Sequence, residues 1–280
     1  MSFPDSGRHG RRGTAVRVLP LLMLLFIIAT ASAESLDGLR ARAKKGDAAA
    51  QCDLGLIYDN GDGGVKQNYE EAVKWYHLAA EQGYAQAQYN LGFMYDNGDG
   101  VKQDYKEAVR WYQAAAQQGH PGALYSLGYM YENGDGVTQN YAEAVRWYSM
   151  ASEFGHAGAQ FSLAMLYENG EGVKQDYTEA VRLSRKAARE GHTNAQFNLG
   201  YMYSSGHGVR QDYEEAAKWW RKAARQGHGP AQFNLGFMYL KGHGTEHNKE
   251  EAVKWLLKAA EQGHEGAVEI LKSLGIDTAF

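Results

Sequence analysis

The chain contains very little cysteine and proline, and each shortage excludes a class of protein. Cys52 is the only cysteine among 280 residues, so an intramolecular disulfide framework and a cysteine-based zinc cluster are both excluded. Only four prolines accompany 34 glycines, a balance that indicates many helix ends and turns and not a disordered chain. The small net charge of −4 argues against a nucleic-acid binder, which needs a clustered basic surface.

Long apolar runs are also scarce, and the one that exists lies near the N-terminus. Arg11, Arg12 and Arg17 precede an apolar run over 18–31, and Ala-Ser-Ala at 31–33 places small residues where a signal peptidase cuts. We therefore expect residues 1–33 to be a secretory signal peptide and the mature protein to be periplasmic or secreted, with no membrane span. The alternative is an uncleaved anchor, but the run is shorter than the roughly 20 residues that span a bilayer.

The sequence is rich in internal repetition, at a period of about 36 residues. A Leu-Gly pair returns in each of six copies, as Leu-Ala in the fourth, and a tyrosine follows four residues after each leucine. The second half of each copy repeats Glu-Ala and then a tryptophan, except that Leu183 takes its place in the fourth copy. The six copies cover residues 47–263, with a lead-in segment over 34–46 and a capping helix and tail over 264–280.

Each copy is expected to form two helices. In the second copy the first helix is predicted from about Ala85 to Asp96, residues 97–100 break it, and the second helix starts at Asp104. Asp104 and Glu107 have the spacing of a capping box, which all six copies share, and a glycine such as Gly119 ends each second helix. Because neither helix can bury its apolar face alone, the copies must stack into an all-α solenoid.

The repeated motif resembles the Sel1-like repeat family, a relative of the tetratricopeptide repeat. It reads Ala-Gln-x-x-Leu-Gly-x-x-Tyr, then Gly-x-Gly-Val-x-Gln-Asp-Tyr, then Glu-Ala-x-x-Trp and Ala-Ala-x-x-Gly, and it covers residues 47 to about 263. The resemblance implies a right-handed α/α superhelix of tandem helix–turn–helix repeats, with an extended concave surface and a scaffold or adaptor role. Some bacterial members with paired cysteines are described as β-lactamase-like or penicillin-binding, and a chain with one cysteine fits that subgroup poorly.

No enzyme motif is present. Ser-x-x-Lys, Gly-x-Ser-x-Gly, His-Glu-x-x-His and a phosphate-binding glycine loop are all missing, so we expect no catalytic residue and no cofactor. The Asp-Asn-Gly-Asp-Gly loops, such as 96–100, fail the EF-hand pattern and are interpreted as turns in which Asn and Gly accept left-handed backbone angles. Cys52 is expected to pack as a small apolar residue.

Histidines are the other candidate metal ligands. Five follow the glycine that ends a second helix, where a cation suits a helix C-terminus, and we interpret them as structural: His120, His156, His192, His228 and His264. His207, His243 and His247 lie in or beside the turns of the last two copies and are a slightly better ligand cluster. No metal site is expected.

The first helix of each copy is apolar on nearly all sides, with aromatic residues at two positions four apart. One hypothesis is packing between copies. It is favoured by the C-terminal helix, expected near Glu265–Leu274, where Glu269 and Ser273 replace both aromatics as a polar cap requires. The competing hypothesis is an aromatic floor in the concave groove. Its candidate contacts with a bound peptide are Tyr89, Asn90, Phe93, Tyr125, Tyr129, Asn198, Tyr201, Asn234 and Phe237.

Among these candidates, Tyr129 and Tyr201 are the better ones, because a fully buried tyrosine needs a hydrogen-bond partner and a groove tyrosine does not. The sequence thus predicts a monomeric scaffold that binds a protein or peptide and is not an enzyme. Two alternatives stay open at this point. One is the β-lactamase-like or penicillin-binding enzyme, and the other is a cell-wall or polysaccharide binder, which the tyrosines, tryptophans and export signal suggest.

Overall fold

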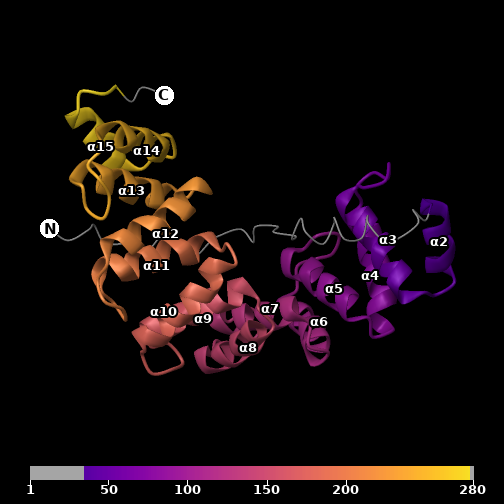
Figure 1. The fold of residues 1–280 in the computed structure, drawn as a ribbon. Coiled ribbons are helices and arrows are strands. Elements are labelled where there is room, and N and C mark those ends of the chain that lie inside the picture. Colours follow the sequence, from indigo (N-terminus) through magenta and orange to yellow (C-terminus); the bar gives the residue numbers. More distant parts are fainter. Residues whose placement is uncertain (1–34, 278–280) are drawn as a thin grey trace.

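The computed structural model describes residues 35–277, and the regular structure in that range consists of fourteen helices (Figure 1). Six pairs of helices form repeats 1 to 6. The first helices are α3 (Ala48–Asn60), α5 (Ala85–Asn97), α7 (Pro121–Asn133), α9 (Ala157–Asn169), α11 (Thr193–Ser205) and α13 (Gly229–Lys241). The second helices are α4 (Tyr69–Glu81), α6 (Tyr105–Gln117), α8 (Tyr141–Glu153), α10 (Tyr177–Arg189), α12 (Tyr213–Arg225) and α14 (Lys249–Glu261).

A shorter helix lies at each end of the repeats. Helix α2 (Leu36–Lys44) falls in the lead-in segment and packs on α3, and α15 (Glu265–Ser273) packs on α14. The signal peptide expected over residues 1–33 lies outside the described residues. No helix between residues 35 and 277 has both the length and the apolar character needed to cross a membrane.

The helices stack in chain order into a curved solenoid. Each one packs on the helix before it and the helix after it, and α7 also contacts α9. Figure 1 shows the stack bent into an arc, with α8 and α10 on its outer side and α7 and α9 on its inner side. The prediction of an all-α, right-handed α/α superhelical solenoid is confirmed.

The predicted helix starts are confirmed, but only one half of the capping box forms. Asp104 Oδ1 accepts hydrogen bonds from the backbone N–H of Lys106 (3.0 Å) and Glu107 (3.2 Å). The Asp104 N–H does not turn to Glu107. It donates instead to the carbonyl of Tyr95 at the end of α5 (2.9 Å), and Glu107 pairs with Arg110 one turn later. The capping residue therefore joins the two helices of its own repeat.

The turn between the two helices is braced by a glutamine and by glycine. Gln103 Nε2 donates to the carbonyl of Asp96 (2.7 Å) and to the hydroxyl of Tyr105 (3.0 Å). Gly100 has φ +70°, and a Cβ there would lie 2.4 Å from the carbonyl carbon of Tyr69, so the turn rests directly on the preceding repeat. In the described part only glycines have positive φ, so the expectation that asparagine shares this conformation is wrong.

The two helices of a repeat approach closely where the Leu-Gly glycine lies. A Cβ on Gly92 would come within 2.7 Å of the Tyr112 ring, and the equivalent glycines face rings or a leucine in the same way. Repeat 4 differs from the other repeats at both of these contact positions. Ala164 replaces the glycine of the first helix, and the fully buried Ser184 replaces the ring of the second helix. The core thus lies between the layers of first and second helices, which leaves the opposite side of the first helices for other contacts.

Candidate partner-binding surface

Two mostly aromatic positions of the first helices, four residues apart, form two rows, while a third position, occupied by Tyr95 and its equivalents, packs on the core. The stacked row consists of Tyr89, Tyr125, Phe161, Phe197 and Phe233. The inner row consists of Leu56, Phe93, Tyr129, Met165, Tyr201 and Phe237. The sequence-predicted contacts include members of both rows, and the structure places the rows in different surroundings.

The stacked row fills the seam between successive first helices. Tyr89 stacks on His120 of the next repeat with ring centroids 4.6 Å apart, and Phe233 stacks on His264 at 4.1 Å. Burial raises the pKa of the Tyr89 hydroxyl above its ordinary value. Cys52 takes the same position in repeat 1, where it is 4% exposed and burial raises the pKa of its thiol to about 12, so its predicted packing role is confirmed.

The histidines that face this row are helix N-caps. His120 Nδ1 accepts the N–H of Ala123 (3.2 Å) at the start of α7, and the other four repeat-end histidines cap the next first helix in the same way. A ring nitrogen that accepts is unprotonated, and burial accordingly lowers the pKa of His120. The expectation of a cation at a helix C-terminus is therefore wrong, because the residue after the closing glycine already belongs to the next helix.

The two rows differ in exposure mainly at Tyr129 and Phe233, because the other stacked-row rings are half-buried like most of the inner row. Tyr129 is 42% exposed, and Phe93, Tyr201 and Phe237 are half-buried, whereas Leu91 and Met94 of the same helix layer are fully buried. Helices α7 and α9, which carry Tyr129 and Met165, lie on the inner side of the arc (Figure 1).

The predicted asparagine contacts already link neighbouring repeats. Asn90 Nδ2 lies 3.9 Å from Cys52 Sγ of repeat 1, and Asn198 Nδ2 donates to Glu168 Oε2 of repeat 4 at 3.0 Å. Asn234 is half-buried at the equivalent place. Packing accounts for these amides and for the rings of Tyr89 and Tyr125, and their part in binding stays a prediction.

Carboxylates that sequence reasoning overlooked lie beside the inner row. Asp96 Oδ2 accepts from the hydroxyl of Tyr112 (3.2 Å), and Glu132 Oε2 accepts from that of Tyr148 (2.7 Å). Burial, with repulsion from Asp135, raises the pKa of Asp96 to about 6 against the lowering effect of Tyr112. The pKa of the Tyr129 hydroxyl is raised by burial and then by the charges of Asp135, Asp96 and Glu132. The concave surface around Tyr129 is therefore negative.

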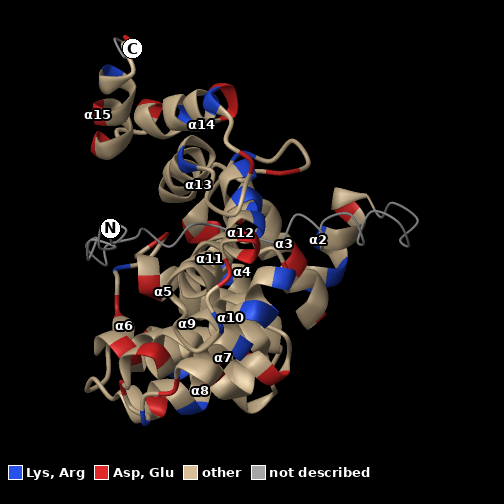
Figure 2. Cartoon of the chain, turned by 60° about the vertical axis from the view of Figure 1, so that its left-hand side comes forward, with Lys and Arg blue, Asp and Glu red and all other residues tan. Residues whose placement is uncertain are grey.

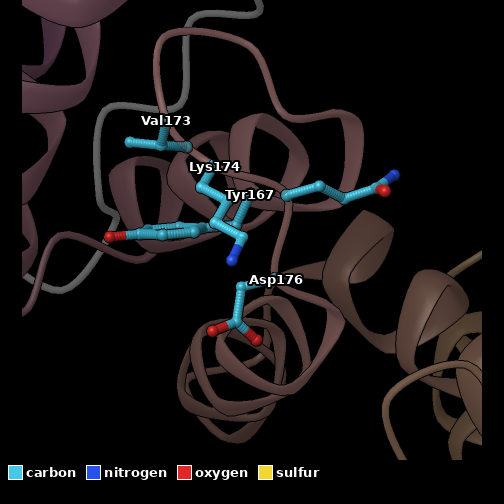
Figure 3. Close-up of a pocket in the computed structure, with 5 residues that line it drawn as sticks. Tyr167, Val173, Lys174 and Asp176 are labelled. Atoms are coloured by element: carbon cyan, nitrogen blue, oxygen red, sulfur yellow. The ribbon is translucent and has the colours of Figure 1, made fainter.

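One hollow elsewhere on the surface is formed by the turn of a repeat. It has a volume of about 400 Å³, lies between α9 and α10 and is lined by Tyr167, Val173, Lys174, Gln175 and Asp176 (Figure 3). Its polar groups hold the turn, since the Asp176 N–H donates to the Tyr167 carbonyl (2.9 Å) and Gln175 Nε2 donates to the Glu168 carbonyl (2.8 Å). This hollow belongs to the helix–turn–helix unit.

The late histidines are also engaged within the fold. The ring of His207 lies 5.4 Å from that of Tyr177, and the ring of His243 lies 5.8 Å from that of Tyr213. Within residues 35–277, no three His, Cys, Asp or Glu side chains are grouped to hold a metal ion.

The comparisons with known proteins agree with this geometry. The family model described as Sel1 repeat matches six consecutive stretches, at residues 48–84, 85–120, 121–156, 157–192, 193–228 and 229–264. The chain belongs to the Sel1 repeat family. The resemblance seen in the motif is thereby confirmed. Proteins with Sel1 repeat solenoids are in general scaffolds for protein interactions.

Two solved Sel1 repeat structures are similar over most of the chain. One is a protective antigen of uropathogenic Escherichia coli, 39% identical over 86% of this chain, with a TM-score of 0.80. This chain spans 53% of that antigen, about half of its length. The other is a Sel1 repeat protein from Oxalobacter formigenes, 37% identical over 80% of this chain and 87% of its own, with a TM-score of 0.70. No curated protein matches the chain.

Proposed function

We propose that this protein is an exported scaffold that binds a protein partner along the concave surface of its Sel1 repeats. The observation that carries the proposal is the exposure of Tyr129 in the inner row. Tyr129 is 42% exposed on a helix whose Leu127 and Met130 are fully buried. An aromatic ring held on a rigid helix gives a large contact area at a low cost in conformational entropy.

The proposal favours binding without catalysis. The inner row supplies apolar surface and hydrogen-bonding hydroxyls, and the general role of the family is interaction with proteins. Export rests on the signal-like segment over residues 1–33. N-terminal sequencing of the exported protein tests that part, and a first residue of Glu34 is the expected result. Retention of Met1 in a membrane fraction would overturn it.

Site-specific photo-crosslinking tests the binding surface. A photoreactive amino acid replaces Tyr129 in cells that produce the protein, and a matched control replaces Tyr177, which is also exposed but lies at the start of α10. We expect one partner protein to be crosslinked at Tyr129 and not at Tyr177, and mass spectrometry identifies it. Equal yields at the two positions, or a crosslink to cell-wall polysaccharide instead of a protein, would contradict the proposal.

A further inference from the structure

Charge is distributed unevenly along the first helices and their turns. In repeats 5 and 6 these stretches, over 193–209 and 229–245, contain no carboxylate and a single cation, Lys241. In repeats 1 to 4 the same stretches, over 48–65, 85–101, 121–137 and 157–173, contain no lysine or arginine, although a lysine is the next residue of the turn in repeats 1, 2 and 4 (Lys66, Lys102 and Lys174). Their acidic residues are Asp53, Asp59, Asp62, Asp96, Asp99, Glu132, Asp135, Glu168 and Glu171.

Most of these carboxylates recur at two fixed places in the repeat. One place is the last turn of the first helix and the other is the glycine-rich turn after it. Repeats 1 to 4 have an acidic residue at both places, as in Asp96 and Asp99 of repeat 2. Repeat 5 has Ser204 and His207 there, and repeat 6 has Leu240 and His243. The acidic band therefore runs beside two-thirds of the inner row and stops after repeat 4.

The structure brings this band against the inner row. Asn198 Nδ2 donates to Glu168 Oε2 (3.0 Å) and lies 3.4 Å from Sδ of Met165, which is itself in the inner row. Asp96 is held by the Tyr112 hydroxyl (3.2 Å), which is a neutral donor and leaves the negative charge in place. The exposed Tyr129 of repeat 3 is near enough to Asp96, Asp135 and Glu132 for their charges to act on its hydroxyl, so apolar and acidic groups lie close together.

We propose that the concave surface of repeats 1 to 4 binds an extended, basic segment of the partner protein. Lysine or arginine side chains of this segment pair with the carboxylate band, and their charges also lie over the rings of Phe93 and Tyr129. Both contacts favour a cation, because an aromatic face attracts one as a carboxylate does. The inference rests on the proposed function and adds the chemistry of the partner to it.

An extended chain advances about 3.3 Å per residue, so a segment of twelve residues is about 40 Å long and can contact several repeats.

The outer layer has the opposite sign over part of its length. Helix α10 carries Arg182, Arg185, Lys186 and Arg189 against the single acid Glu179, and Figure 2 shows blue segments along α10 and α12. A basic segment is therefore directed to the inner surface and repelled from this part of the outer one.

The test uses labelled peptides of twelve residues and the full chain without residues 1–33, at low ionic strength. One peptide has arginine at every third position with serine and alanine between, and its control has glutamate in place of arginine. Fluorescence anisotropy gives the affinities. We expect the arginine peptide to bind and the glutamate peptide not to bind. Equal binding of the two, or no binding of the arginine peptide, would overturn the inference.

Charge-neutralising variants locate the site. Asp96→Asn with Glu168→Gln removes two carboxylates of the band and retains their hydrogen-bond acceptors. The matched control is Glu70→Gln with Glu153→Gln, which removes two exposed carboxylates from second helices. We expect the first pair to weaken the arginine peptide about tenfold, the effect of losing two partly exposed ion pairs, and the control pair to change it little. Equal losses in the two double variants would contradict the assignment.

The two proposals can fail separately. If Tyr129 crosslinks a partner protein whose binding is unaffected by the Asp96 and Glu168 substitutions, the scaffold function stands and the basic chemistry of the partner is wrong. If Tyr129 crosslinks no protein, the scaffold function itself is wrong, whatever the peptides show.

Discussion

The stacked row and the inner row use the same kinds of residue on the same helices and serve different purposes. Phe233 and Phe237 show the contrast within one helix, since Phe233 is 7% exposed against His264 and Phe237 is half-buried at the edge of the concave surface. A shift of four residues, about one helical turn, separates the buried ring of Phe233, which contacts the next repeat, from the half-buried ring of Phe237. Position relative to the next repeat, and not residue type, decides which role a ring has.

The largest effect on stability is expected from truncation in the stacked row. Phe233→Ala should lower the free energy of unfolding by about 3–5 kcal/mol, because it leaves a cavity against His264 and α15. Phe237→Ala removes the same atoms from a half-exposed site and should cost about 1 kcal/mol or less. Urea unfolding followed by circular dichroism measures both. Similar losses for the two variants would remove the distinction between the rows.

The histidines of the stacked row should make stability depend on pH. Their folded pKa values are lowered from 6.5, so the unfolded chain takes up protons at a higher pH than the folded chain does. The stability that they contribute is complete above pH 6.5 and is lost as the pH falls below that value. His120→Asn keeps an N-capping acceptor but removes a group that titrates. The number of protons taken up on unfolding, which the slope of unfolding free energy against pH measures, should therefore fall by at most one. An unchanged slope would mean that His120 is not a neutral cap.

Beside the inner row the sign of the pH effect is reversed. The pKa of Asp96 is raised from 3.8 to about 6, so its ionised carboxylate lowers the stability of the folded protein above pH 6. This destabilisation disappears as the pH falls toward 3.8. Asp96→Asn should therefore raise stability at pH 7 by up to about 2 kcal/mol, and this gain should vanish near pH 4. Thermal unfolding at the two pH values measures it. Glu153→Gln, at an exposed carboxylate, is the control, and a destabilised Asp96→Asn variant would show that the charge is needed for folding.

Most of the fold could be predicted from the sequence because local signals coincide with the repeat. The position of Asp104 caps a second helix in every repeat, and the position of Gly92 is a glycine in every repeat except the fourth. Periodicity and capping therefore predict the helix ends to within about one residue. The partner of Glu107 could not be predicted, since the capping residue has a competing acceptor in the Tyr95 carbonyl from another helix. His120 was misassigned because helix end and helix start are adjacent in the sequence.

The candidate surface was only partly predictable for a related reason. Tyr125 and Tyr129 lie one turn apart on the same helix, and both are tyrosines, so sequence pattern alone groups them together. Their separation depends on contact with His156, which comes from the next repeat. The carboxylates beside Tyr129 recur at steps of 36 or 37 residues in repeats 1 to 4, and that recurrence was the available signal.

The smallest effect on stability and the largest effect on binding are expected together in the inner row. The double variant Tyr129→Ala with Tyr201→Ala removes two rings of the inner row and none of the stacked row. Tyr125→Ala with Phe197→Ala is the matched control, because it truncates two rings of the stacked row on the same two helices.

Partner capture by the Tyr129/Tyr201 double variant, measured alongside its unfolding free energy, tests the central claim most directly. The account predicts that the variant loses the partner identified by crosslinking while its unfolding free energy falls by no more than about 2 kcal/mol, as for two half-exposed rings. A fall of about 3–5 kcal/mol for each tyrosine, as for a truncated core aromatic, would show that the inner row is core. Retained binding in a stable variant would show that the partner is held elsewhere.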